Sequence, residues 1–96
     1  MGMNELLKTK REDILAIANK HGVTSIRVFG SIARGEARPE SDIDFLVEVG
    51  QTRSFFFPSG FISDLEKLLG RHVDVVTPKG LHWFIRDRVL KEAVPL

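Results

Sequence analysis

The sequence contains no cysteine, no large excess of charge of either sign and no long hydrophobic run. Without cysteine, the chain can form no disulfide, no thiolate zinc site and no cysteine nucleophile. Fourteen basic against thirteen acidic residues leave a net charge of +1, which argues against a protein that coats nucleic acid. Apolar runs such as residues 55–58 are far shorter than the ~20 residues that cross a bilayer. Since no targeting signal is recognisable either, we expect a cytoplasmic protein that binds no membrane.

The length of 96 residues allows one domain, which we expect to span residues 1–96. A chain of this size buries only about 60–68% of its unfolded surface, so it has little room for an enclosed substrate chamber. Any chemical site therefore lies in an open groove, which a partner can complete.

The hydrophobic pattern predicts helices and strands in alternation. Predicted helices cover about residues 5–20, 61–69 and 81–92, with a compact helical turn or short helix after Gly30, through Arg34. Apolar residues at helical spacing mark the buried faces of the last two helices, and Gly70 ends the first of them: Phe61, Ile62, Leu65, Leu68 and Leu69, then Leu81, Phe84, Ile85 and Val89. Predicted strands cover residues 25–29, 42–49 and 73–76. The order α-β-α-β-α-β-α indicates an α/β (α+β) fold, with one small sheet of about three strands flanked by helices.

Three aspartates occupy sequence that otherwise looks like buried strand, where aspartate is depleted. Asp42 and Asp44 point the same way on their strand, about 6.6 Å apart at ~3.3 Å per residue, and Asp74 lies about 4.8 Å away if its strand is the neighbour. Such a triangle fits one or two hard divalent cations. Without a cation, two charges ~6 Å apart repel by about 3 kcal/mol at an effective dielectric constant of ~20. The alternative is that the aspartates lie at strand ends, facing water or pairing with arginines.

A glycine-serine turn follows the first predicted strand. The backbone N–H groups and the Ser31 hydroxyl can face an anion, and Gly30 lets a phosphate approach the backbone closely. The alternative is an ordinary tight turn with Ser31 as a helix N-cap. A Walker A site is excluded, because Glu36 and Ala37 stand where Lys and Ser/Thr are required.

Residues 30–47, GSIARGEARPESDIDFLV, closely resemble the signature of the minimal nucleotidyltransferases in the DNA polymerase beta superfamily. That family carries Gly-Ser, an Ala-Arg-Gly turn and then Ser-Asp-x-Asp on a strand. The similarity continues through residues 68–77, LLGRHVDVVT, and the final helix ending at residues 92–94. It covers nearly the whole chain and implies the nucleotidyltransferase fold with a mixed sheet.

The resemblance also implies a role for each matching residue. Gly30 and Ser31 would hold the β- and γ-phosphates of an incoming nucleotide. Asp42 and Asp44 would ligate two Mg²⁺ ions. Asp74 would complete the metal shell and activate the acceptor hydroxyl.

Three basic residues near these positions are further candidates for phosphate contact. Arg34 lies one turn after Ser31 and could reach a phosphate or the aspartate pair, so we include it among the nucleotide-binding residues. Arg38 and Lys79 are weaker candidates. For each, the alternative is a solvated or ion-paired surface residue.

The aromatic and histidine residues carry less information. His21, His72 and His82 have no metal-ligand spacing and no acidic partner nearby in sequence, so we expect surface or capping roles. We expect Trp83 to be packed or at an interface. The run Phe55, Phe56 and Phe57 indicates core or subunit contact, and together with the last helix we expect it to contribute to association with a subunit.

The resemblance implies transfer of a nucleoside monophosphate, AMP from ATP, to a hydroxyl with release of pyrophosphate. Chains of this family are often encoded beside a helical HEPN-domain protein, and as antitoxins they adenylylate a tyrosine of that partner. One alternative is a binding module that neutralises a helical partner by contact alone. Another is an enzyme that modifies a small molecule, although no separate substrate domain is evident.

Overall fold

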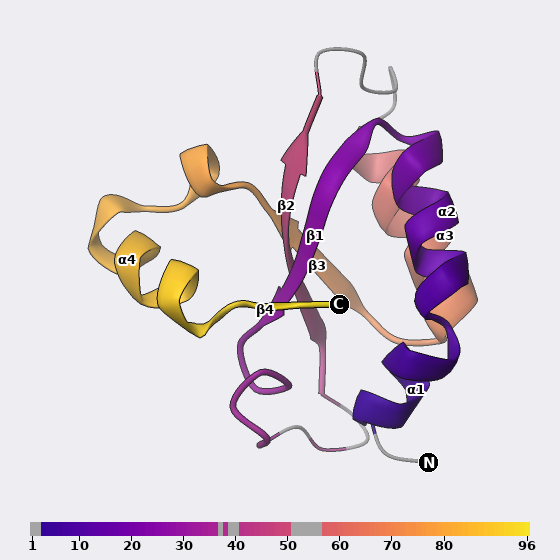
Figure 1. Cartoon of the computed structure of the whole chain (residues 1–96), viewed down its shortest axis with the longest axis horizontal. Helices are drawn as coiled ribbons and strands as arrows, with labels where there is room; N and C mark the ends of the chain where they lie inside the picture. Colours follow the sequence, from indigo (N-terminus) through magenta and orange to yellow (C-terminus); the bar gives the residue numbers. More distant parts are fainter. Residues whose placement is uncertain (1–2, 37, 39–40, 51–56) are drawn as a thin grey trace.

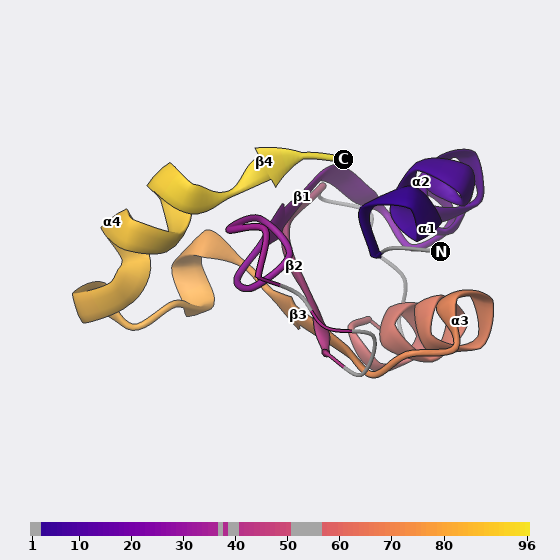
Figure 2. The same cartoon turned by 90° about the horizontal axis from the view of Figure 1, so that it is seen from below.

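A four-stranded mixed sheet organises the residues that the structure, a computed structural model, describes: 3–36, 38, 41–50 and 57–96. Three helices cover one face of the sheet and a fourth lies beyond the other face (Figures 1 and 2). In chain order the elements are α1 (Met3–Thr9), α2 (Arg11–Lys20), β1 (Val23–Phe29), β2 (Ile43–Val49), α3 (Ser59–Leu69), β3 (Val73–Val76), a 3₁₀ turn (Pro78–Gly80), α4 (Trp83–Glu92) and β4 (Val94–Pro95).

The strand order is β3-β2-β1-β4, which places the two predicted acidic strands side by side. β1 pairs antiparallel with β2 and with β4, whereas β2 and β3 run parallel. In the parallel pair, Asp44 lies opposite Asp74. Since parallel neighbours begin at the same edge of the sheet, the residues that precede both strands also come together there.

Successive side chains of β2 point to opposite faces of the sheet, so that one face lies in the core and the other carries the candidate site. Ile43, Phe45 and Val47 are fully buried beneath α1, α2 and α3. Burial of a side chain of this kind contributes about 1.5–3 kcal/mol. Asp44 and Leu46 point to the opposite face, because successive strand residues alternate. Leu46 is fully buried there in a small second cluster beneath α4.

α3 forms because its apolar residues recur at helical spacing and bury one face. Phe61, Leu65 and Leu69 are buried, and Gly70 ends the helix with a left-handed φ of 66°. That conformation carries no Cβ penalty in glycine. None of the helices in the described part of the chain is both long and apolar enough to cross a membrane.

The fold class is confirmed, while several boundaries differ from the prediction. The first helix is broken at Lys10 into α1 and α2. Of the compact helical turn or short helix expected through Arg34, the described residues 30–36 form the turn, in which Arg34 N–H donates to the Gly30 carbonyl at 3.1 Å. The sheet has four strands where about three were predicted, because β4 adds one. It is too short for hydrophobic alternation to reveal, because only Val94 and Pro95 belong to it.

The prediction for the last helix was partly wrong. Leu81 and Val89 are buried as expected, but Phe84 is 75% exposed and Ile85 is 40% exposed. Trp83 beside them is 76% exposed, so it is not packed within the chain. Among the described residues, the buried members of the second core cluster are Leu46, Leu81 and Val89, too few to cover the first turn of α4.

Two other expectations also change. His21 does cap the C-terminus of α2, but it is 5% exposed, and its Nε2 lies 2.8 Å from Asp64 Oδ2. Phe57 packs against the main core and stacks on Phe61, with ring centroids 6.0 Å apart, which argues against a subunit contact for that residue. Phe55 and Phe56 lie outside the described residues.

Candidate active site at the start of strands β2 and β3

The three aspartates converge at one edge of the sheet. Asp42 immediately precedes β2, while Asp44 and Asp74 lie opposite each other on β2 and β3. Asp42 and Asp74 are exposed, and Asp44 is half-buried. The triangle predicted from strand geometry is therefore present, on the face of the sheet away from α1, α2 and α3.

The proximity of the three carboxylates affects the pKa of Asp44. Its pKa is raised from 3.8 to about 6. Burial is the largest cause, since desolvation disfavours the charged carboxylate, and repulsion from Asp74 and Asp42 adds to it. Arg34 acts in the opposite direction. A cation placed between these groups would relieve the repulsion.

The Gly30 turn lies directly against Asp44. Gly30 has a φ of 76°, a left-handed conformation that favours glycine. A Cβ added at this position would collide with Asp44 Oδ2 and lie 3.2 Å from Asp44 Cγ. Glycine is therefore required twice over, by the backbone and by the neighbouring carboxylate. Ser31, the next residue in the chain, is half-buried.

Glu92, at the end of α4, holds this turn in place. Its Oε2 accepts a hydrogen bond from Gly30 N–H at 3.1 Å, and its Oε1 lies 2.9 Å from Arg34 Nη1. Bonding to Arg34 lowers the pKa of Glu92, and the Gly30 bond contributes to the same effect. Sequence reasoning did not single out Glu92, because nothing local distinguishes it from any acidic residue at a helix end.

Arg34 is an ion-paired residue in this structure, which is the alternative considered for it. Besides Glu92, it pairs with Glu36 at 3.2 Å, and these hydrogen bonds raise its pKa. It still acts electrostatically on Asp44. Arg38 is exposed, and its backbone N–H donates to Ser41 Oγ at 2.8 Å. Lys79 lies exposed in the 3₁₀ turn after β3.

A pocket of about 180 Å³ opens beside the Gly30 turn, between β1 and α4. Gly30, Arg34 and Arg88 contribute to its wall together with Glu92. Glu92 already accepts hydrogen bonds from Gly30 N–H and Arg34 in this wall, so a phosphate bound there would have to displace it.

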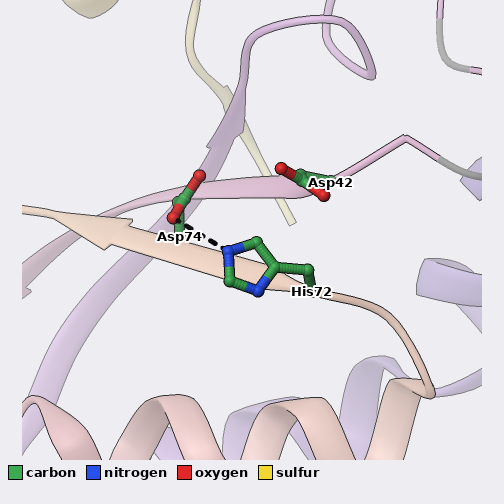
Figure 3. Close-up of side chains that lie close together, drawn as sticks. All are labelled: Asp42, His72 and Asp74. Atoms are coloured by element: carbon green, nitrogen blue, oxygen red, sulfur yellow. Dashed lines mark ion pairs between the residues drawn. The ribbon is translucent and has the colours of Figure 1, made fainter.

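His72 also belongs to the cluster, contrary to the expectation that it lacks an acidic partner. Its Nδ1 lies 3.0 Å from Glu66 Oε2, and its Nε2 lies 3.6 Å from Asp74 Oδ1. Figure 3 shows the ring reaching from the start of β3 toward Asp74, with Asp42 across from it. One ligand atom from each of Asp42, His72 and Asp74 lies within 4.8 Å of the other two.

These residues fit a bound divalent metal. Oxygen donors from three aspartates are the ligands that Mg²⁺ and related ions prefer. Burial, together with repulsion from Asp74 and Asp42, raises the pKa of Asp44, and a bound cation would favour its charged form. Asp42 and Asp74 are exposed, so the site is open for a metal to enter.

Comparison with known proteins agrees with this geometry. Residues 10–96 match the nucleotidyltransferase domain family. The chain belongs to this family. The resemblance to minimal nucleotidyltransferases, and the fold that it implied, are thereby confirmed, and the protein is an enzyme of the nucleotidyltransferase class.

Relatives of this nucleotidyltransferase match it along most of their length. A candidate protein adenylyltransferase of Methanocaldococcus jannaschii is 42% identical over 94 residues, which cover 98% of this chain and 97% of the relative. Protein adenylyltransferase MntA of Thermococcus cleftensis is 40% identical over 78 residues, covering 81% and 79% of the two chains.

Solved structures share its fold. A candidate minimal nucleotidyltransferase superposes with a TM-score of 0.83 at 44% identity, covering 96% of this chain and 94% of the other. A chain from a toxin–antitoxin crystal structure with AMP-PNP superposes with a TM-score of 0.72 at 21% identity, covering 88% and 69%. At that identity the second likeness concerns the fold alone.

Proposed function

We propose that this nucleotidyltransferase transfers AMP from ATP to a hydroxyl group and releases pyrophosphate. The proposed acceptor is a tyrosine of a co-encoded helical HEPN-domain protein, toward which the chain acts as antitoxin. The observation that carries the proposal is the placement of Asp42, Asp44 and Asp74 against the Gly30–Ser31 turn.

In the proposed reaction the triphosphate lies across the turn. The Ser31 hydroxyl and the backbone N–H groups of the turn would face the phosphate oxygens, with Gly30 N–H released from Glu92. Two Mg²⁺ ions held by Asp42, Asp44 and Asp74 would neutralise phosphate charge and lower the pKa of the acceptor hydroxyl.

The chemical step is an in-line displacement at the α-phosphorus. The acceptor oxygen forms a bond to that phosphorus while the bond to the bridging α–β oxygen breaks, and pyrophosphate leaves. Asp74 accepts the hydroxyl proton, for which its exposed position at the sheet edge is suitable. Catalysis then depends mainly on positioning and charge, which a small sheet can supply.

Support for a protein acceptor comes from the relatives. Several of them, 40% or more identical to this chain, are described as protein adenylyltransferases. The exposed Trp83 and Phe84 add support, because large apolar side chains at 76% and 75% exposure on one helix end are typical of interaction surfaces.

The decisive experiment incubates the protein with α-labelled ATP, Mg²⁺ and its co-encoded neighbour. We expect the label on the neighbour, and we expect a Tyr-to-Phe change at the labelled residue to abolish it. Asp74→Asn should lose transfer almost completely but keep part of the nucleotide-dependent thermal stabilisation, because Asp42 and Asp44 remain. The matched control is Asp87→Asn, an exposed position within α4, which should retain transfer.

The same reagents test neutralisation by contact alone, which the exposed end of α4 favours as a second candidate. If Asp74→Asn neutralises the partner as well as the wild type does, contact is sufficient and transfer is not the function. If the double change Trp83→Ser, Phe84→Ser abolishes neutralisation and Asp74→Asn does not, the contact surface lies on α4. Label recovered on a small molecule instead of protein would indicate the third alternative, a small-molecule nucleotidyltransferase.

A further inference from the structure

His72 is held in one orientation by α3. Glu66 Oε2 accepts a hydrogen bond from Val73 N–H at 2.9 Å and lies 3.0 Å from His72 Nδ1. The carboxylate is thus fixed to the backbone of β3 beside the ring that it contacts. In Figure 3 the nitrogen that faces α3 lies on the opposite side of the ring from the one that faces Asp74.

The contact between Glu66 Oε2 and His72 Nδ1 indicates which ring nitrogen carries the proton when His72 is neutral. A carboxylate oxygen 3.0 Å away calls for a proton on Nδ1. The distance of 3.6 Å from Nε2 to Asp74 Oδ1 is too long for a hydrogen bond, so it does not require a proton on Nε2. In this tautomer the lone pair lies on Nε2, the ring nitrogen that faces Asp74.

A carboxylate that accepts the distal N–H of a histidine is the usual outer support of a metal-bound imidazole. Two ligands of an octahedral ion with bonds of about 2.1 Å lie between about 3.0 and 4.2 Å apart. The 3.6 Å from Nε2 to Asp74 falls inside that range, and all three ligand atoms lie within 4.8 Å of one another. All three residues are exposed, so their side chains have room to rotate toward a common ion.

We propose that His72 Nε2 is a metal ligand together with Asp42 and Asp74, oriented by Glu66, and that it makes this site prefer a first-row transition-metal ion such as Mn²⁺ or Co²⁺ over Mg²⁺. The inference rests on the proposed function in that it concerns the same metal centre, and it changes which ion that centre takes. Imidazole nitrogen is a poor ligand for Mg²⁺, which binds oxygen and retains water, but a good one for ions further along the first transition row.

The test measures binding of the metal alone at pH 7.5. Co²⁺ is titrated by its visible absorption, which responds to a nitrogen ligand, and Mg²⁺ is titrated by calorimetry. His72→Asn places an amide near the former Nδ1, where it can still donate to Glu66, and removes Nε2. We expect it to weaken Co²⁺ binding about tenfold or more, in line with the effect of losing metal-site groups, and Mg²⁺ binding by less than about threefold.

Two further variants make the result specific. His82→Asn changes an exposed histidine at the N-terminus of α4, outside the cluster, and should leave both affinities unchanged. Glu66→Gln keeps an acceptor for Val73 N–H and His72 while it removes the charge. It should therefore reduce Co²⁺ affinity less than His72→Asn does.

Each outcome separates the inference from the proposed function. Equal Co²⁺ affinity in His72→Asn and wild type, with loss of both metals in Asp44→Asn, would overturn the histidine ligand and leave the carboxylate site standing. Equal losses for Co²⁺ and Mg²⁺ in His72→Asn would overturn the preference, because a structural disturbance affects both ions alike. Absence of Co²⁺ binding by the wild type would overturn the inference, whereas the labelling experiment with Mg²⁺ would still decide the transfer reaction.

Discussion

Replacing Asp44 by Asn should stabilise the metal-free protein, which is unusual for a half-buried residue in a strand. The pKa of Asp44 is raised from 3.8 to about 6 by burial and by repulsion from Asp74 and Asp42. Because the folded protein binds this proton more tightly than the unfolded chain does, ionisation of Asp44 destabilises the fold. The cost is absent below pH 3.8, increases as the pH rises toward 6 and is complete above 6.

The magnitude follows from the same shift. A rise from 3.8 to about 6 corresponds to about 3 kcal/mol at neutral pH. Solvent screening of a half-buried group reduces this to about 1–2 kcal/mol. For a domain of this size, that difference corresponds to a melting temperature about 5–10 °C above wild type.

The assay is thermal unfolding in a chelator at pH 4 and pH 7.5, with Asp87→Asn as the control. We expect Asp44→Asn to match wild type at pH 4 and to exceed it at pH 7.5. With Mg²⁺ and ATP the order should reverse, because only the wild type gains stability from binding. If Asp44→Asn instead melts well below wild type at both pH values, Asp44 is a structural hydrogen-bond partner and the repulsion argument is wrong.

Three further changes test the elements around the aspartates. Gly30→Ala should abolish nucleotide-dependent stabilisation and lower the melting temperature, because its Cβ collides with Asp44 and φ is 76°; equal nucleotide affinity by calorimetry would refute this. Glu92→Gln should lower the melting temperature by a few degrees at pH 7 and raise the KM for ATP more than it changes kcat. Since the pKa of Glu92 is lowered from 4.5, its stabilisation is present above pH 4.5 and should disappear as the pH falls below that value. Asp64→Asn should lower the melting temperature at pH 7 and leave transfer unchanged, because Asp64 pairs with Lys20 and His21 at the C-terminus of α2, away from the aspartates; a large loss of transfer would contradict that separation.

Much of the fold could be predicted from local sequence, because the strongest signals are periodic. Alternation in β2 and the helical spacing of Phe61, Leu65 and Leu69 determined which faces are buried. Gly70 marked the end of α3, since a left-handed residue there favours glycine. The aspartate triangle followed from strand geometry once Asp74 was taken to lie on a neighbouring strand, and the parallel register of β2 and β3 confirms that step.

The remaining contacts depend on chain segments that only tertiary structure brings together. Glu92 meets Gly30 across 62 positions, and His21 meets Asp64 across 43, so no local pattern could indicate either pair. The exposure of Phe84 could not be predicted either. The helical spacing of apolar residues shows which side chains share a face, but it does not show whether the sheet beneath is wide enough to cover them. His72 lies only two residues from Asp74, yet its role depends on Glu66 of α3, which fixes the ring.

The sequence by itself determined the chemistry available at the edge of the sheet, since residue type and strand periodicity are local. Tertiary structure decided which groups support that chemistry, because support requires contact between residues that are distant in the chain.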